Sequence, residues 1–136
     1  MQLTPLELLD TARNRELFRF LAVTKPSAHS DLVDALLRVA AAALGDYQVI
    51  CPLPASYSYT FLSTKGVGFA LAHGMSALSI AVPQTLVRRA LDTGATAEPR
   101  IGAQWITLEL FRADWPQPDL HFWLLKAYSH ARHPAD

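Results

Sequence analysis

A single cysteine, Cys51, occurs among the 136 residues. The chain can therefore form no internal disulfide and no cysteine-based zinc cluster. Residues 1–5 lack the basic segment and the apolar run of a secretory signal. No window approaches the roughly 20 apolar residues that a membrane-spanning helix needs. From these absences we expect a cytoplasmic protein without a membrane segment, and we predict no metal site and no cofactor.

The sequence also lacks net charge, because twelve basic residues balance twelve acidic ones. Without a global field that attracts a polyanion, nucleic acid is disfavoured as the main partner. One local asymmetry remains: no acidic residue occurs between Asp46 and Asp92, whereas Lys65, Arg88 and Arg89 lie inside that span. The span can form a positive face for a phosphate or a carboxylate, or it can be a sheet, in which acidic residues are scarce.

Motifs of nucleophilic hydrolases and of nucleotide-binding loops are missing as well. Neither Ser56 nor Ser58 lies in a Gly-x-Ser-x-Gly elbow. Gly66–Gly68 is too short for a phosphate-binding loop. Cys51 stands in an apolar, strand-like context that is typical of a buried thiol. These absences leave no catalytic set that can be recognised by its spacing.

Apolar residues make up 51% of the chain and charged residues 18%, which favours a packed domain over a disordered chain. No repeat or linker divides the sequence, so we expect one domain that spans residues 1–136. Its first part is predicted to be helical. A helix is expected to begin at Thr4 and run to about Val23, and a second helix to run from Ser30 to Gly45.

The second part alternates between large and small residues, as strands do. Three such runs cover residues 57–61, 67–71 and 78–82, and a fourth runs from Trp105 to Phe111. Turn-like connections join the first three runs as hairpins. Pro83 is expected to begin a short helix that ends at Gly94, and a last helix follows residues 115–118. The sequence therefore predicts an α+β fold with an antiparallel sheet of about four strands, two N-terminal helices, one helix between strands and one C-terminal helix, with the helices against one face.

Small residues gather on one side of these runs and form our main functional idea. The expected floor consists of Ser58, Thr60, Gly68, Ala70, Ala72, Ser79, Ala81 and Thr107. Its expected rim consists of Tyr47, Lys65, His73, Trp105 and Glu109. A concave floor with few polar groups is typical of small-molecule and peptide sites. The alternative is that the N-terminal helices lie directly on this floor.

Two residues of the rim can carry acid–base chemistry. His73, at a hairpin end, can titrate near neutrality if a carboxylate lies beside it. Glu109 shares a strand face with Trp105, and burial of that face would raise the pKa of the carboxyl group. If the face is wet, Glu109 is an ordinary surface residue. The histidines of the last helix lack the spacing by which a helix holds a metal.

The C-terminal half resembles two families. Leu78–Pro83, Gly102–Leu108 and Lys126–Ser129 resemble the MmcQ/YjbR-type small α+β domain. Phe69–Gly74, followed by Leu78–Pro83 and Gly94–Pro99, is similar to the uncharacterised domain called "luciferase family protein". The second resemblance implies further histidines where this chain has Ser79 and Arg100. Neither family implies a defined activity, and the first is similar to domains suspected of touching DNA.

Taken together, these patterns favour a binding or interaction module that binds a protein partner or itself as a homodimer. Trp115 and Phe122 are the expected contact residues, because exposed aromatic side chains often mark contacts between chains. One alternative is a small-molecule binder or small enzyme that uses the small-residue face. Another is a DNA-binding accessory protein that uses the three basic residues between Asp46 and Asp92.

Overall fold

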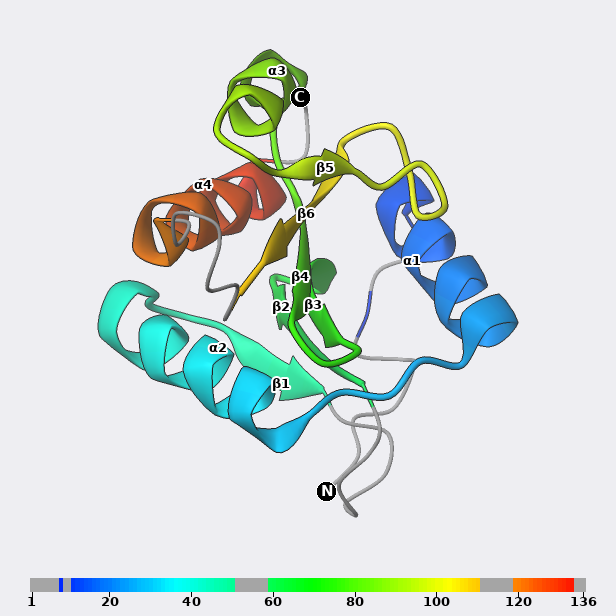
Figure 1. Cartoon of the computed structure of the whole chain (residues 1–136), viewed down its shortest axis with the longest axis vertical. Coiled ribbons are helices and arrows are strands. Elements are labelled where there is room, and N and C mark those ends of the chain that lie inside the picture. The colour runs from blue at the N-terminus through cyan, green and yellow to red at the C-terminus, as the bar shows by residue number, and fades with distance from the viewer. Residues whose placement is uncertain (1–7, 9–10, 51–58, 111–118, 134–136) are drawn as a thin grey trace.

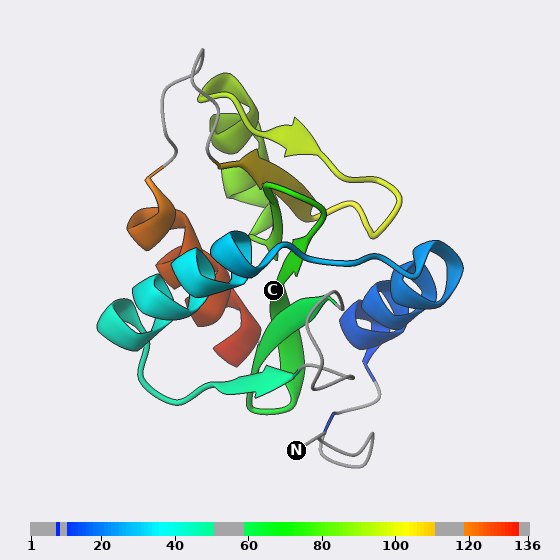
Figure 2. The same ribbon diagram turned by 60° about the horizontal axis from the view of Figure 1, so that its bottom comes forward.

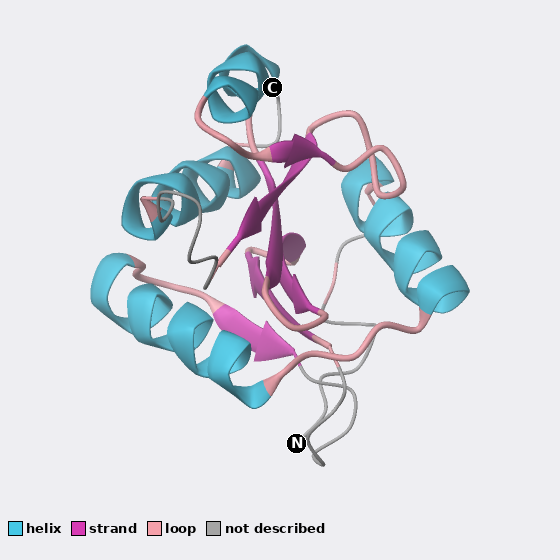
Figure 3. Cartoon of the chain, viewed as in Figure 1, coloured by secondary structure: helices cyan, strands magenta, loops and turns pink. Residues whose placement is uncertain are grey.

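The computed structural model describes Leu8 and residues 11–50, 59–110 and 119–133 (Figure 1). Four helices and six strands follow one another in these residues: α1 Ala12–Thr24, α2 Ser30–Ala43, β1 Gln48–Ile50, β2 Thr60–Thr64, β3 Val67–His73, β4 Ala77–Ala81, α3 Gln84–Asp92, β5 Thr96–Ala97, β6 Trp105–Glu109 and α4 Leu120–Arg132. The strands form one antiparallel sheet in the order β1-β2-β3-β4-β6-β5. The predicted α+β class and the antiparallel sheet are confirmed (Figure 3).

The hairpins of the sheet close where the sequence places turns. Lys65 and Gly66 connect β2 to β3 with φ angles of 51° and 80°, the pair of positive values that a type I′ turn requires. Gly74 follows β3 with φ 72°. The alternating runs on either side of these turns then pair as neighbours, because a short turn leaves antiparallel strands side by side.

Helices cover both faces of the sheet (Figure 2). On one face, which we call the α2/α4 face, Leu36 and Leu124 pack over Leu62, Leu78 and other buried apolar residues. On the other face, which we call the α1 face, Leu17, Phe20 and Leu21 of α1 pack over Ile50, Phe61, Leu71, Ala81 and Trp105. The apolar side of each of these helices is therefore buried against an apolar face of the sheet, as a layered α+β structure requires.

The prediction that all helices lie against one face is wrong, and the prediction of about four strands is too low. β5, between α3 and β6, was missed because a strand of two residues shows no alternation. β1, with only three residues, is also absent from the predicted runs, and it pairs with β2 at the sheet edge.

The expected floor of small residues does not form, because the strand register divides it between the two faces. Ala70 lies opposite Ile80, and Ala72 lies opposite Leu78, so these alanines belong to the α2/α4 face. Ser79 lies opposite Thr107 on the α1 face. Ser58 lies outside the described residues.

A register shift between β2 and β3 explains why Gly68 and Ala70, which alternation places on one face, lie on opposite faces of the sheet. Leu62 pairs with Ala70, but the next residue, Ser63, pairs with Gly68, which leaves Phe69 as an extra residue. Such a bulge reverses the alternation of faces along its strand. A Cβ added to Gly68 would meet Leu17 of α1, whereas Ala70 faces the other way.

The helix boundaries differ at two ends. The predicted cap Thr4 lies outside the described residues, and α1 begins only at Ala12, where the Thr11 side chain accepts a hydrogen bond from Asn14 N. α2 ends at Ala43 before Leu44, and Gly45 does not adopt a positive φ. α3 is followed by Gly94 at φ 109° as expected. None of the helices in the described residues has the length and apolar character needed to cross a bilayer.

Candidate functional site

Of the residues predicted to bind a ligand, three lie together on the α1 face. His73, Trp105 and Thr107 are all buried there. Glu109 follows on β6 but is only half-buried, and its carboxylate accepts a hydrogen bond from Ser76 Oγ at 2.8 Å. The α1 face is thus covered at Trp105 and Thr107, and it becomes wet at the end where Glu109 lies.

Lys65 and Tyr47 lie elsewhere. Lys65 is exposed in the turn between β2 and β3. Tyr47 packs against the core of the α2/α4 face. The structure therefore does not bring these two residues to a common rim with His73.

A continuous run of hydrogen bonds crosses the α1 face. His73 Nε2 lies 2.8 Å from Ser79 Oγ, and Ser79 Oγ lies 2.7 Å from Thr107 Oγ1. Thr107 Oγ1 donates to Glu98 Oε1 at 2.9 Å. Arg100 closes the run on the same carboxylate, with Nε 2.8 Å from Oε2 and Nη2 3.3 Å from Oε1. We refer to these five residues as the polar chain.

The carboxylate fixes the direction of every bond in the polar chain. An ionised carboxylate only accepts, so the one hydroxyl proton of Thr107 goes to Glu98. Ser79 must then donate its own proton to Thr107 Oγ1, and the remaining bond requires a proton on His73 Nε2. The hydrogen-bond network therefore assigns the imidazole as the Nε2–H tautomer.

Burial controls the charge of His73. Desolvation lowers the pKa of His73 and outweighs the nearby charge of Glu98, which raises it. The charge of Arg100 lowers the pKa of His73 further, and the charge of Glu109 raises it. The imidazole is thus neutral at neutral pH.

Glu98 is held in its ionised form. Burial raises the pKa of Glu98, but hydrogen bonds from Arg100 and Thr107, together with the charge of Arg100, leave the pKa below its ordinary value. The same pairing raises the pKa of Arg100. A buried carboxylate with three hydrogen bonds is a strong anchor, because breaking one of them leaves a buried charge poorly satisfied.

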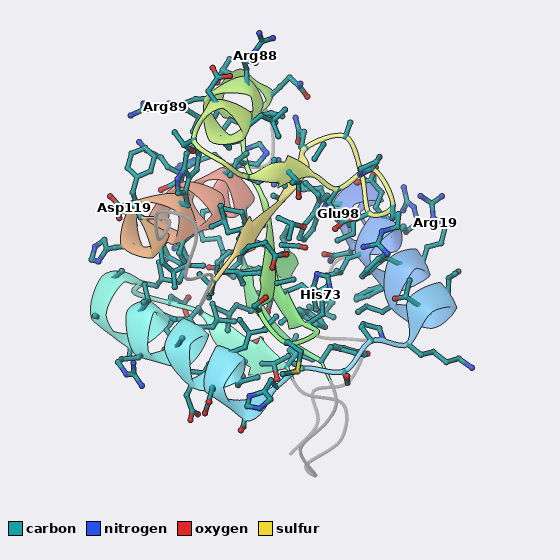
Figure 4. The ribbon with its side chains drawn as sticks, viewed as in Figure 1. Arg19, His73, Arg88, Arg89, Glu98 and Asp119 are labelled. Atoms are coloured by element: carbon teal, nitrogen blue, oxygen red, sulfur yellow. The ribbon has the colours of Figure 1, made fainter. Side chains whose placement is uncertain are left out.

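Helix α1 covers the polar chain through the side chain of Phe20. The Phe20 ring lies edge-on to the His73 ring at 5.6 Å, and the Arg100 guanidinium lies 5.3 Å from the Phe20 centroid. Figure 4 shows His73 and Glu98 between the sheet and α1. Ser79 is 0% exposed, so it cannot attack a substrate that arrives from solvent. The arrangement fixes α1 and the segment after β5 on the sheet.

The segment from Glu98 to Trp105 is organised by Glu98 itself. The Glu98 carbonyl accepts hydrogen bonds from Ile101 N and Gly102 N, and Glu98 N donates to the Trp105 carbonyl. Ile101 is fully buried beneath α1. This closed loop presents Ala103 and Gln104 at the end of the sheet where β6 begins.

A cleft of about 440 Å³ opens beside this loop, between the start of α1 and the sheet. Its apolar part includes Trp105 and Ala81, which are paired across β6 and β4. Its polar lining consists of Thr11, Arg13, Glu16, Gln84 and Gln104. Two of these side chains carry opposite charges three residues apart on α1, so they share one side of that helix.

Contacts with α4 and with the loop position the charged groups of the cleft. Arg13 Nη1 donates to the carbonyl of His130 at 3.1 Å, and His130 Nε2 lies 3.2 Å from Gln104 Oε1. Glu16 lies on Gly102, where an added Cβ would come within 2.6 Å of Oε1 and 3.0 Å of Oε2. Only a glycine leaves room for the carboxylate in this place.

Sequence reasoning missed Glu98 and Glu16. Glu98 is the one acidic residue between Asp92 and Glu109, and Arg100, two positions later, pairs with it across the turn that follows Glu98. The only signal in the sequence was this pair of opposite charges two positions apart. Glu16 had none, because its place depends on Gly102, which is far away in the sequence.

The predicted contact aromatics do not form an exposed patch in the described residues. Trp115 lies outside them. Phe122 is half-buried, with Arg89 at 5.1 Å and Lys126 at 5.3 Å from its ring centroid. The exposed large apolar side chains in the described segments come from α1, β1, the β3–β4 turn, α3 and α4: Phe18, Val23, Val49, Met75, Leu91 and Leu125.

The basic residues proposed for DNA lie on separate elements. Arg88 and Arg89 project from α3 (Figure 4), and Arg88 pairs with Asp92 at 3.6 Å. Lys65 lies in a hairpin turn. Within the described part of the chain, no three His, Cys, Asp or Glu side chains gather as metal ligands would. Cys51 lies outside that part.

No family model, no curated protein and no solved structure matches this chain. The resemblances of the C-terminal half to two families remain predictions.

Proposed function

We propose that this protein is a binding module for a small polar molecule, which it holds in the cleft between α1 and the sheet. The cleft itself carries the proposal. Its volume of about 440 Å³ lies within the range of about 300–1,000 Å³ that small-molecule sites occupy. Small-molecule sites are concave, and a few polar groups converge on an apolar wall. Trp105 and the polar side chains around it fit that description.

The chemistry of the described lining favours binding over catalysis. Its polar groups are a guanidinium, a carboxylate, two carboxamides and the Thr11 hydroxyl. That hydroxyl already accepts a hydrogen bond from Asn14 N as the cap of α1. The only imidazole of the polar chain, His73, lies at the far end of β3 from Val67, the β3 residue that lines the cleft. These groups recognise a ligand, and they offer no paired nucleophile and base.

The experiment uses 5-fluorotryptophan as a reporter. Trp105 lines the cleft, whereas Trp123 lies in the core of the α2/α4 face. We expect members of a library of small polar fragments to shift the ¹⁹F resonance of Trp105 and to leave that of Trp123 unchanged. Substituting each tryptophan by phenylalanine assigns the resonances.

A blocking variant and a matched control test the location. Ala103→Phe places a ring in the cleft, because Ala103 lines it. Ala97→Phe adds the same ring on β5, where Ala97 is exposed and does not line the cleft. We expect the first variant to abolish the fragment response and the second to keep it. No Trp105 response from any fragment, or an equal response in both variants, would refute the proposal.

A further inference from the structure

Glu16 distinguishes this cleft from an ordinary surface hollow. Glu16 is half-buried on α1, and its carboxylate lies beside Gly102, where a side chain would otherwise stand. It also lines the cleft. In the described part of the chain, no hydrogen bond or ion pair engages the Glu16 side chain. The Glu16 carboxylate is thus an acceptor at the wall of the cleft, open to a donor on a ligand.

A carboxylate accepts hydrogen bonds and carries negative charge, so its complement is a cationic donor. A protonated amine is the simplest such group. The Glu16 carboxylate lies against Gly102, whose N donates to the Glu98 carbonyl at 3.2 Å, so the loop after β5 forms the surface beside this acceptor.

Arg13 defines the other half of the ligand. Arg13 lines the same cleft from the same side of α1, one turn before Glu16, and its Nη1 donates to the His130 carbonyl. A ligand with only positive charge would meet repulsion from Arg13, and a ligand with only negative charge would meet repulsion from Glu16. A ligand that carries an ammonium and a carboxylate complements both. Gln84 and Gln104 then offer donors and acceptors to its remaining polar atoms.

We infer that the cleft binds a zwitterionic amine of the amino-acid type, with its ammonium group on Glu16 and its carboxylate toward Arg13. This inference rests on the proposed function, because it needs a ligand in the cleft. It names the chemical class of that ligand and the residue that selects it.

The test compares free amino acids with their N-acetyl derivatives, which keep the carboxylate and lose the charged amine. Both sets are titrated into the 5-fluorotryptophan protein at neutral pH, and the Trp105 resonance gives the dissociation constant. At least one free amino acid is expected to bind, and its N-acetyl derivative to bind at least tenfold more weakly. Equal binding of the two forms would overturn the inference and leave the proposed function standing. If neither set binds while neutral fragments do, the ligand class is again wrong.

Glu16→Gln provides the residue-level test. The amide keeps the shape and removes the charge, so we expect at least a tenfold loss of amino-acid affinity with an unchanged response to neutral fragments. Asp34→Asn is the control, because Asp34 is an exposed acid on α2 that does not line the cleft. Thermal melts show that both variants fold. If Glu16→Gln binds amino acids as tightly as Asp34→Asn, the carboxylate does not select the ligand and the inference fails.

Discussion

Replacing Thr107 by valine tests the polar chain at its centre. Valine keeps the shape of threonine but removes the hydroxyl that donates to Glu98 at 2.9 Å and lies 2.7 Å from Ser79 Oγ. Because Thr107 is 4% exposed, water cannot replace either bond without opening the structure. The substitution therefore removes two buried hydrogen bonds. Glu98 loses one of its donors, and the Ser79 hydroxyl loses its acceptor.

The cost follows from the charges involved. A hydrogen bond to a charged group contributes about 1.5–3 kcal/mol, and a buried polar group left without a partner costs about 1–3 kcal/mol. Glu98 keeps both bonds from Arg100, so we expect a total in the lower half of that sum, about 2.5–4 kcal/mol. For a chain of this length, 1 kcal/mol corresponds to roughly 3–4 °C in Tm. The variant should melt roughly 8–15 °C below the parent.

Urea unfolding at neutral pH measures this loss, and Thr96→Val is the matched control. Thr96 lies directly opposite Thr107 on β5 but is exposed, so its substitution should change stability by less than about 0.5 kcal/mol. Imidazole ¹⁵N shifts of the parent give a second readout, since the network requires the Nε2–H tautomer of His73. A loss within 0.5 kcal/mol of the control, or an Nδ1–H tautomer in the parent, would refute the reasoning.

Three further substitutions probe separate contacts. His73→Gln should flatten the acid dependence of stability: burial lowers the folded-state pKa below 6.5, so the unfolded chain binds the proton first and the parent loses stability as pH falls through about 6.5. Urea midpoints at about pH 7.5 and 5.5 that fall equally in both proteins would contradict this. Gly68→Ala places a Cβ 2.7 Å from Leu17 Cδ2 and should lower the free energy of unfolding by about 1–3 kcal/mol through overpacking. An unchanged free energy of unfolding in urea would show that α1 shifts to accommodate the methyl group without cost. Gly102→Ala should displace the Glu16 carboxylate, which is the end of a flexible side chain, and thus weaken amino-acid binding with little change in Tm; an unchanged dissociation constant would speak against the carboxylate as the ligand's partner.

The features that the sequence predicted well are local ones. Turns at Lys65–Gly66 and Gly74, the short helix after Pro83 and the stripe of α4 each depend on residues within a few positions of one another. Such signals survive folding, because the turn conformations and helix ends that they require are set by neighbouring residues.

The errors arose where distant residues decide. The bulge at Phe69 changes which face Gly68 and Ala70 occupy, and nothing in the strand itself announces it. The covering of the sheet by α1 depends on Leu17 and Phe20, and the sequence left open whether the N-terminal helices lie on the small-residue side of the strands. His73 and Thr107 were both assigned to the expected site, and in the structure Ser79 links them. The carboxylate that is hydrogen-bonded to Thr107 belongs to Glu98, whereas Glu109 accepts a hydrogen bond from Ser76.

The loop after β5 joins the polar chain to the cleft, which has a consequence for binding. The Glu98 carboxylate accepts a hydrogen bond from Thr107 Oγ1, and the Glu98 backbone carbonyl accepts one from Gly102 N. The Glu16 carboxylate lies beside Gly102. A substitution at Thr107 does not touch the cleft lining, yet it loosens the anchor of the loop that forms one wall. Thr107→Val should therefore weaken amino-acid binding severalfold at temperatures where the variant is fully folded, whereas Thr96→Val should not. Equal dissociation constants for these two variants would show that the loop holds its shape without the polar chain, and that the cleft and the network are independent.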